Sequence, residues 1–352
     1  MIFCTCFDKG YLDKGLVLYR SLSKCCPEFH LYIACFDTTV YKVLSDCHLS
    51  DVTLLDWQQY ETEAFLEKKR ERTRAEYYWT CTTHIIELVL DQYQEEHCIY
   101  IDADMAFFSD PTVLLAEIRQ AGSHIGIMEH RFNDNWMGHR YLRRSGRYCV
   151  EFNYFDQTEE SRRALTWWKE RCWEWCYQIY EPERMGDQKY LEQFPALFQG
   201  VYVFENPGAG VAPWNLAQYR LADQVSRANA IAEKRITLLY QKKTKTPLIF
   251  YHFQNICYAS DKYVNIGTGV RDKALKKAIY YPYLAEIENV RKELEQYGVG
   301  FSETKVASSH AVMRIWEKYF MKFKMKSASD FIRLEDVRNE VCTDNSARAL
   351  EI

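Results

Sequence analysis

Short apolar runs alternate with amphipathic ones along the first third of the chain. The apolar runs predict strands, and runs with an apolar position every three or four residues predict helices. The predicted strands cover residues 1–7, 29–36, 51–57 and 98–104, and the predicted helices cover residues 15–24, 39–46 and 72–93. This β-α-β-α order favours an α/β fold with a mainly parallel sheet and helices on both faces.

The later pattern is less regular. We predict strands at residues 124–130, 146–156, 200–204 and 247–253, and helices at residues 159–180 and 186–195. Beyond about residue 259 the chain becomes charged and helical, with a loose tail after about residue 330. This shift predicts a first domain over residues 1–258 and a helical C-terminal extension over residues 259–352.

Composition limits the classes of protein to consider. The chain has 352 residues, is 47% hydrophobic and carries a net charge of -4, which allows a large buried core. Its mild acidity argues against a nucleic-acid partner, which normally requires a basic face. We recognise neither a signal peptide nor an apolar run long enough for a membrane span. The 13 cysteines are scattered, several within apolar runs, which favours reduced thiols and a cytoplasmic location.

Two carboxylates stand where a strand that appears buried should end. Asp102 and Asp104 directly follow the run "CIYI". Ligands of parallel sheets bind at the carboxyl ends of strands, and two carboxylates that converge there suit Mg²⁺ or Mn²⁺. The alternative is that Asp104 caps a helix and Asp102 is simply solvated.

Further motifs favour the metal interpretation. The stretch "YIDADMAFFSDP" resembles the D-x-D element of GT-A glycosyltransferases, notably glycosyltransferase family 8 and bacterial nucleotide-diphospho-sugar transferases found with surface-polysaccharide genes. Supporting motifs occur in the same order, namely "CFDKGYLDKGLVLYRSL", "RTRAEYYWT", "EFNYF", "GDQKYL", "NPGAGVAPWN" and "YHF". The resemblance covers residues 1 to about 256. It implies a Rossmann-like GT-A fold and metal-dependent transfer, with retention, from a nucleotide sugar such as a UDP-sugar to a glycan or lipid-linked acceptor.

The resemblance also implies a metal site and a nucleotide site. Asp102 and Asp104 match the metal-binding pair, with Asp102 also near the ribose, and His252 matches the histidine that completes the site. On the residues alone, His252 is more often a satisfied core histidine. Asp8 and Tyr11 match positions that bind and stack on the uracil, although a loop tyrosine also packs without a ligand.

The sugar-binding positions follow in the same way. Asn153 matches an asparagine that contacts the donor sugar, but here bulky residues follow it where the family has small ones. Asp187 and Gln188 match the catalytic pair beside the anomeric carbon, and Asp187 could equally cap a helix. Trp214 and Asn215 offer a platform and a polar group to a sugar or acceptor, with a structural turn as the alternative.

One departure concerns the diphosphate. The family often follows its metal histidine with a glycine and a lysine that clamps the phosphates, whereas this chain has "HFQNICYASDK". We therefore predict that Arg72, Arg74 or Lys262 takes this role. The alternative for the two arginines is a solvated helix face.

The sequence is compatible with two stereochemical outcomes, two roles for a basic segment and two other classes of protein. Retention would place Gln188 at the anomeric centre, whereas inversion would need a base such as Asp187, Asp134 or Glu151. The basic aromatic segment 310–326 favours peripheral contact with the inner face of the cell membrane, or packing on the core. Two other classes compete, a haloacid-dehalogenase-like phosphatase and a non-catalytic sugar-nucleotide or glycan-binding module. The phosphatase pattern needs Thr or Val where this chain has Ala106.

Overall fold

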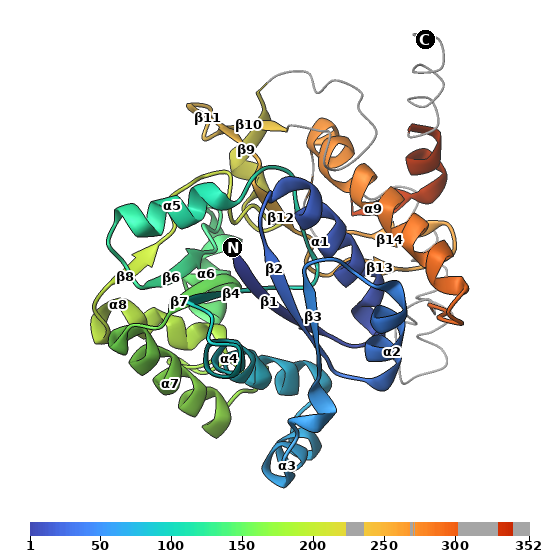
Figure 1. Ribbon diagram of the computed structural model, residues 1–352. Helices are drawn as coiled ribbons and strands as arrows, with labels where there is room; N and C mark the ends of the chain where they lie inside the picture. The colour runs from blue at the N-terminus through green and yellow to red at the C-terminus, as the bar shows by residue number, and fades with distance from the viewer. Residues whose placement is uncertain (223–235, 268–269, 271, 302–329, 341–352) are drawn as a thin grey trace, which may run out of the picture.

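A computed structural model describes residues 1–222, 236–267, 270, 272–301 and 330–340 of the chain. Its centre is a seven-stranded sheet in the order β3-β2-β1-β4-β7-β6-β8 (Figure 1). The strands are β1 (Ile2–Phe7), β2 (His30–Cys35), β3 (Val52–Asp56), β4 (His97–Ile101), β6 (Ile125–Glu129), β7 (Tyr148–Asp156) and β8 (Val201–Val203). The neighbours of β7 run antiparallel to it, and the other pairs are parallel. The predicted α/β fold with a mostly parallel sheet is confirmed.

Helices cover both faces of the sheet. On one face lie α1 (Leu12–Cys25), α2 (Thr38–Cys47), α5 (Thr112–Gln120) and α9 (Lys273–Glu295), and on the other lie α4 (Arg74–Gln92) and α7 (Glu159–Glu174). Alternate side chains of β1 enter the two cores: Phe3 and Phe7 join the first, and Cys4 and Cys6 the second. This alternation follows from the two-residue period of a strand that is buried on both faces.

Three further α-helices lie in the described chain. They are α3 (Glu63–Glu71), α6 (Trp136–Ser145) and α8 (Phe194–Leu197), with a 3-10 helix over Gln188–Gln193. The helix predicted to reach residue 180 ends at Glu174. The chain beyond it is held by tertiary hydrogen bonds instead, because the Tyr190 hydroxyl donates to the Trp175 carbonyl at 2.8 Å and the Gln178 amide donates to Glu76 at 2.6 Å.

A small two-stranded sheet brings distant segments together at the carboxyl end of β4. The strand β12 (Phe250–His252) runs antiparallel to β5 (Met105–Phe107), with His252 opposite Met105. The Phe253 amide also donates to the Asp104 carbonyl at 2.8 Å. The polar turn between β4 and β5 therefore lies beside the end of β12.

The C-terminal part packs on the α1 side. Along α9, Glu286 pairs with Arg20 at 2.8 Å and Arg291 pairs with Asp13 at 2.6 Å. Two small sheets complete the described chain, one of β9 (Tyr219–Leu221), β10 (Thr237–Tyr240) and β11 (Thr244–Pro247), the other of β13 (Cys257–Tyr258), β14 (Tyr263–Asn265) and β15 (Phe331–Arg333). The domain boundary at residue 258 stays a prediction.

The loose tail predicted after residue 330 is wrong for its first part. There β15 pairs with β14, and residues 334–340 are helical, because Ile332, Leu334 and Val337 join the core on the α1 side. The proposed membrane segment 310–326 lies outside the described residues. Within the described residues, no helix combines the length and apolar character that a membrane span requires.

Candidate functional site

Three predicted metal ligands meet at the carboxyl end of β4. Nε2 of His252 lies 3.1 Å from Oδ1 of Asp104 and 3.6 Å from Oδ2 of Asp102. One ligand atom from each residue falls within 4.8 Å of the other two. Two carboxylate oxygens and one imidazole nitrogen form a donor set that fits a divalent cation.

The three groups share charge, with Asp104 and His252 buried and Asp102 partly exposed. Burial, with the nearby charges of Asp104 and Glu151, raises the pKa of Asp102 to about 6. Burial opposes ionisation of Asp104 and His252 too, but their mutual attraction wins, so the pKa of Asp104 falls and that of His252 rises well above its ordinary value. An imidazolium thus balances the carboxylates, and a bound cation would take over this task.

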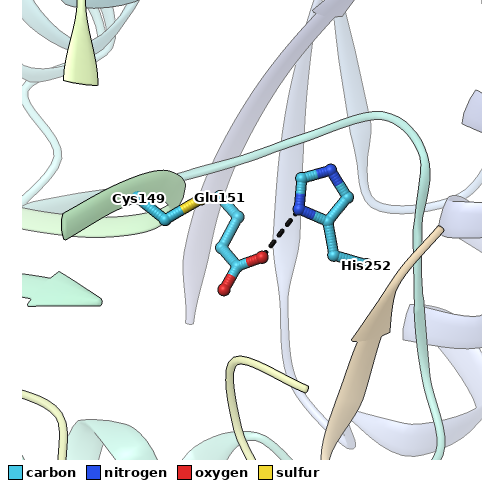
Figure 2. A group of neighbouring side chains, drawn as sticks. All are labelled: Cys149, Glu151 and His252. Atoms are coloured by element: carbon cyan, nitrogen blue, oxygen red, sulfur yellow. Dashed lines mark hydrogen bonds and ion pairs between the residues drawn. The ribbon is translucent and has the colours of Figure 1, made fainter. Parts of the chain in front are cut away.

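A third carboxylate holds the other side of the histidine ring. Glu151 lies on β7 with a fully buried side chain, and its Oε2 is 2.7 Å from Nδ1 of His252 (Figure 2). Cys149 comes from the same strand and forms a second candidate group with Glu151 and His252. Burial raises the pKa of Cys149 to about 12, which favours a neutral thiol over a metal-binding thiolate.

The predicted nucleotide residues lie after β1, at the same edge of the sheet. The carboxylate of Asp8 accepts hydrogen bonds from the Gly10 amide at 2.9 Å and the Tyr78 hydroxyl at 2.8 Å, and it pairs with Arg74 at 3.1 Å. Tyr11 is 37% exposed. The charge of Asp104, followed by burial and the charge of Asp102, raises the pKa of Tyr11.

Lys14, on the first turn of α1, lies near these residues but is not among the predicted site residues. Its side chain is largely buried, and Nζ lies 3.8 Å from the centre of the Tyr11 ring. The charge of Lys14 helps to lower the pKa of Asp104, although no carboxylate among the described residues lies within ion-pair distance of Nζ. The only signal in the sequence was its place directly after "FDKGYLD".

The predicted catalytic pair lies at the start of a 3-10 helix. Asp187 is buried, and burial together with the charge of Asp102 raises its pKa to about 8. The amide of Gln188 donates to the Ser145 carbonyl at 2.9 Å. Asn153 is fully buried opposite Tyr100 of β4, and neither polar atom of its side chain has a hydrogen-bond partner among the described residues.

Arg72 and Asn215 direct their polar groups into the protein, and their predicted ligand contacts stay predictions. The guanidinium of Arg72 is buried and donates to the Thr80 hydroxyl and to the carbonyls of Cys172, at 3.0 Å, and Trp173, at 2.6 Å, so it joins α4 to the end of α7. Asn215 is fully buried; its oxygen accepts from the Ala212 amide, and its nitrogen donates to two carbonyls. Both side chains are used inside the protein.

Trp214 lies between the predicted metal ligand His252 and a groove. Its indole nitrogen donates to the His130 carbonyl at 2.8 Å, and its ring meets that of His252 edge to face, with centroids 5.3 Å apart. The ring also lines a groove of about 660 Å³ between α6, the segment around residues 213–220 and the start of α9. Lys262 follows β13, and no role at the site emerges for it.

The fold and the site together define an α/β protein with a candidate cation site where β4 and β12 end. No family model matches the chain. It is 30% identical over 315 residues to the uncharacterized protein YfnD of Bacillus subtilis (strain 168). The aligned residues make up 88% of this chain and 96% of YfnD. The chain therefore belongs to the same family as YfnD. Its identity to YfnF of the same strain is 30% over 257 residues, or 71% of this chain and 80% of YfnF.

Solved structures with which the chain aligns include glycosyltransferases. The galactosyltransferase LgtC, solved in complex with donor and acceptor sugar analogues, aligns with 14% identity and a TM-score of 0.47 over 72% of this chain and 87% of its own. GlyE of Streptococcus pneumoniae TIGR4 aligns with 11% identity and a TM-score of 0.47 over 86% of this chain and 65% of its own.

Proposed function

We propose that the protein is a glycosyltransferase that moves a sugar from a nucleotide-diphosphate sugar, specifically a UDP-sugar, to a glycan or lipid-linked acceptor. The observation that carries this proposal is the convergence of Asp102, Asp104 and His252 at the carboxyl end of a mostly parallel sheet. Ligands of such sheets bind at this edge.

Asp102, Asp104 and His252 would hold Mn²⁺ or Mg²⁺. When bound, this cation neutralises the negative charge that develops on the leaving diphosphate as the bond to the sugar breaks. The closeness of the two carboxylates, Asp104 buried and Asp102 partly exposed, favours this role, because like charges that are largely removed from water require a nearby cation.

The donor nucleotide would lie along the loop after β1. Asp8 and Tyr11 would contact the uracil there, and Asp102 the ribose. The ammonium of Lys14 would face the diphosphate, since this buried cation lacks a carboxylate partner among the described residues and its charge helps to lower the pKa of Asp104. Arg74 lies nearby through its pair with Asp8 and is exposed enough to reach a phosphate.

The acceptor would occupy the groove beside Trp214. This ring touches His252 on one side and lines the groove on the other, so an acceptor hydroxyl there would lie close to the donor sugar. Flat aromatic faces suit the apolar faces of sugar rings. The unpartnered amide of Asn153 would contact the donor sugar from the strand next to β4.

Retention of configuration is the stereochemistry that we favour. Inversion requires a base, but Asp134 is 95% exposed and paired with His139, and Glu151 is occupied by His252. With a pKa of about 8, Asp187 is protonated at neutral pH. Gln188 would then face the anomeric centre, and the departing phosphate would take the proton of the acceptor.

The setting of the reaction is part of the same proposal. We place it in the cytoplasm, in the synthesis of a surface polysaccharide, with residues 1–258 as the catalytic domain. Residues 259–352 would form the extension that meets the acceptor or the inner face of the membrane.

A thermal-shift panel tests the function. UDP and UDP-sugars should raise the melting temperature with Mn²⁺ or Mg²⁺ but not with EDTA, because a ligand that binds only the folded state stabilises it. Without an acceptor, the enzyme should slowly hydrolyse the matching UDP-sugar and release UDP. The Asp104→Asn variant should lose both this hydrolysis and the metal-dependent shift. A shift without any turnover would identify a binding module. The absence of a response to any nucleotide would refute the proposal.

A further inference from the structure

The imidazole of His252 is held from two sides by groups of different strands. Nε2 faces Asp102 and Asp104 on the turn between β4 and β5, whereas Nδ1 faces Glu151 on β7. Figure 2 shows the carboxylate of Glu151 directed at the ring nitrogen, with the side chain of Cys149 on the same strand. Each ring nitrogen therefore has its own environment.

Glu151 occupies a costly position. Its side chain is 0% exposed, and its Oε1 has no hydrogen-bond partner among the described residues. Burial of a carboxylate costs several kcal/mol unless the charge is paired and hydrogen-bonded. The hydrogen bond to His252, at 2.7 Å, is the compensation that the described chain provides. The sequence thus keeps a charge in a strand whose neighbouring positions, Val150 and Phe152, are apolar and buried.

The chemistry of imidazole links this contact to the metal site. A neutral imidazole has one nitrogen that donates and one that accepts, and a carboxylate can only accept. A carboxylate at Nδ1 therefore keeps the proton on that nitrogen and leaves the lone pair of Nε2 free as a ligand.

We propose that Glu151 is a positioning residue that fixes the ring orientation and tautomer of His252, so that Nε2 is presented to a divalent cation between Asp102 and Asp104. This inference rests on the proposed metal-dependent function and names the residue that prepares its metal site. The competing arrangement places the cation on the other side of the ring, between Cys149, Glu151 and Nδ1. Nδ1 is already engaged by Glu151, and the two aspartates supply the harder ligand set, so the geometry favours Nε2.

The test compares three variants in the full-length protein. Glu151→Leu removes the acceptor at similar volume, Glu151→Gln keeps an amide oxygen that can accept from Nδ1, and Cys149→Ala is the matched control on the same strand. Mn²⁺ affinity is measured by titration calorimetry without nucleotide, and urea unfolding checks that each variant is folded. The absorption spectrum of the Co²⁺-loaded protein reports the ligand atoms.

We expect Glu151→Leu to bind Mn²⁺ about 10 to 100 times more weakly, as is usual when a metal histidine loses its supporting carboxylate. Glu151→Gln should restore much of this loss, and Cys149→Ala should bind like the wild type. Co²⁺ should produce no thiolate charge-transfer band. Wild-type affinity in a folded Glu151→Leu, a Gln variant as weak as the Leu variant, or a thiolate band that Cys149→Ala abolishes would each overturn the proposal.

The same measurements distinguish a failure of the positioning role from a failure of the proposed function. If the wild type binds Mn²⁺ and UDP but Glu151→Leu changes neither, the proposed function stands and the positioning role is refuted. If the wild type binds neither, the proposed function fails and the inference fails with it.

Discussion

Asp187 makes the stability of the metal-free protein depend on pH. Burial and the charge of Asp102 raise its pKa from 3.8 to about 8 in the folded state. Between these values the folded protein keeps a proton that the unfolded chain has released, so the free energy of unfolding falls as the pH rises. Asparagine cannot ionise but keeps an acceptor oxygen for the local backbone amides. Asp187→Asn should therefore remove this pH dependence.

The size of the effect follows from the two pKa values. Each pH unit between them is worth up to ~1.4 kcal/mol for one group. The interval from 3.8 to about 8 spans roughly four units, which sets an upper bound of about 6 kcal/mol. Relative to the wild type, Asp187→Asn should gain stability progressively from about pH 4 to pH 8 and no more above that.

Urea unfolding of both proteins in EDTA, at pH values from 5 to 9, measures this difference directly. Groups that both proteins share, including Asp102 and His252, largely cancel in the comparison. A difference that is constant with pH, or that shrinks as the pH rises, would show that Asp187 is ionised in the folded protein. The argument for retention, which relies on a protonated Asp187, would then lose its support.

Two further substitutions separate binding from structure. Lys14→Met keeps most of the length of the side chain but removes its charge. We expect the affinity for UDP with Mn²⁺, measured by calorimetry, to fall about tenfold or more, while the melting temperature changes little. Unchanged affinity would exclude contact between Lys14 and the diphosphate. Arg72→Met should lower the free energy of unfolding by about 2–4 kcal/mol, because it leaves buried carbonyls unpaired, while the folded variant still binds UDP normally; weaker UDP binding without destabilisation would restore the predicted phosphate role.

The central strands, and the order in which strands and helices follow one another along the first third of the chain, could be predicted because the local patterns are strong. Strands buried on both faces appear as short apolar runs, and the intervening helices have a clear period. The helix α6 was not predicted, because Gly138 interrupts its pattern and its outer face is basic and aromatic. The pairing of β12 with β5 has no local signal, since it depends on tertiary packing.

The candidate site likewise has features that the sequence predicts and features that depend on tertiary packing. Motifs predicted Asp102, Asp104 and His252 as metal ligands, and the structure brings the three together, but a motif gives the position of a residue and not the direction of its side chain. Arg72 and Asn215 carry polar groups in the matching positions, and both direct them into the protein. Glu151 could have been found as a charge within an alternating apolar strand, yet the partner that makes it useful lies on a different strand.

The pairing of β12 with β5 has a consequence for the synthesis of the protein. The strands β1 to β4 and the two aspartates leave the ribosome long before the segment that carries His252. A nascent or truncated chain that lacks β12 would therefore expose two carboxylates without the ring that completes the set. Capture of a cation at this candidate site, and any reaction that needs it, would wait until the chain has been made through residue 252.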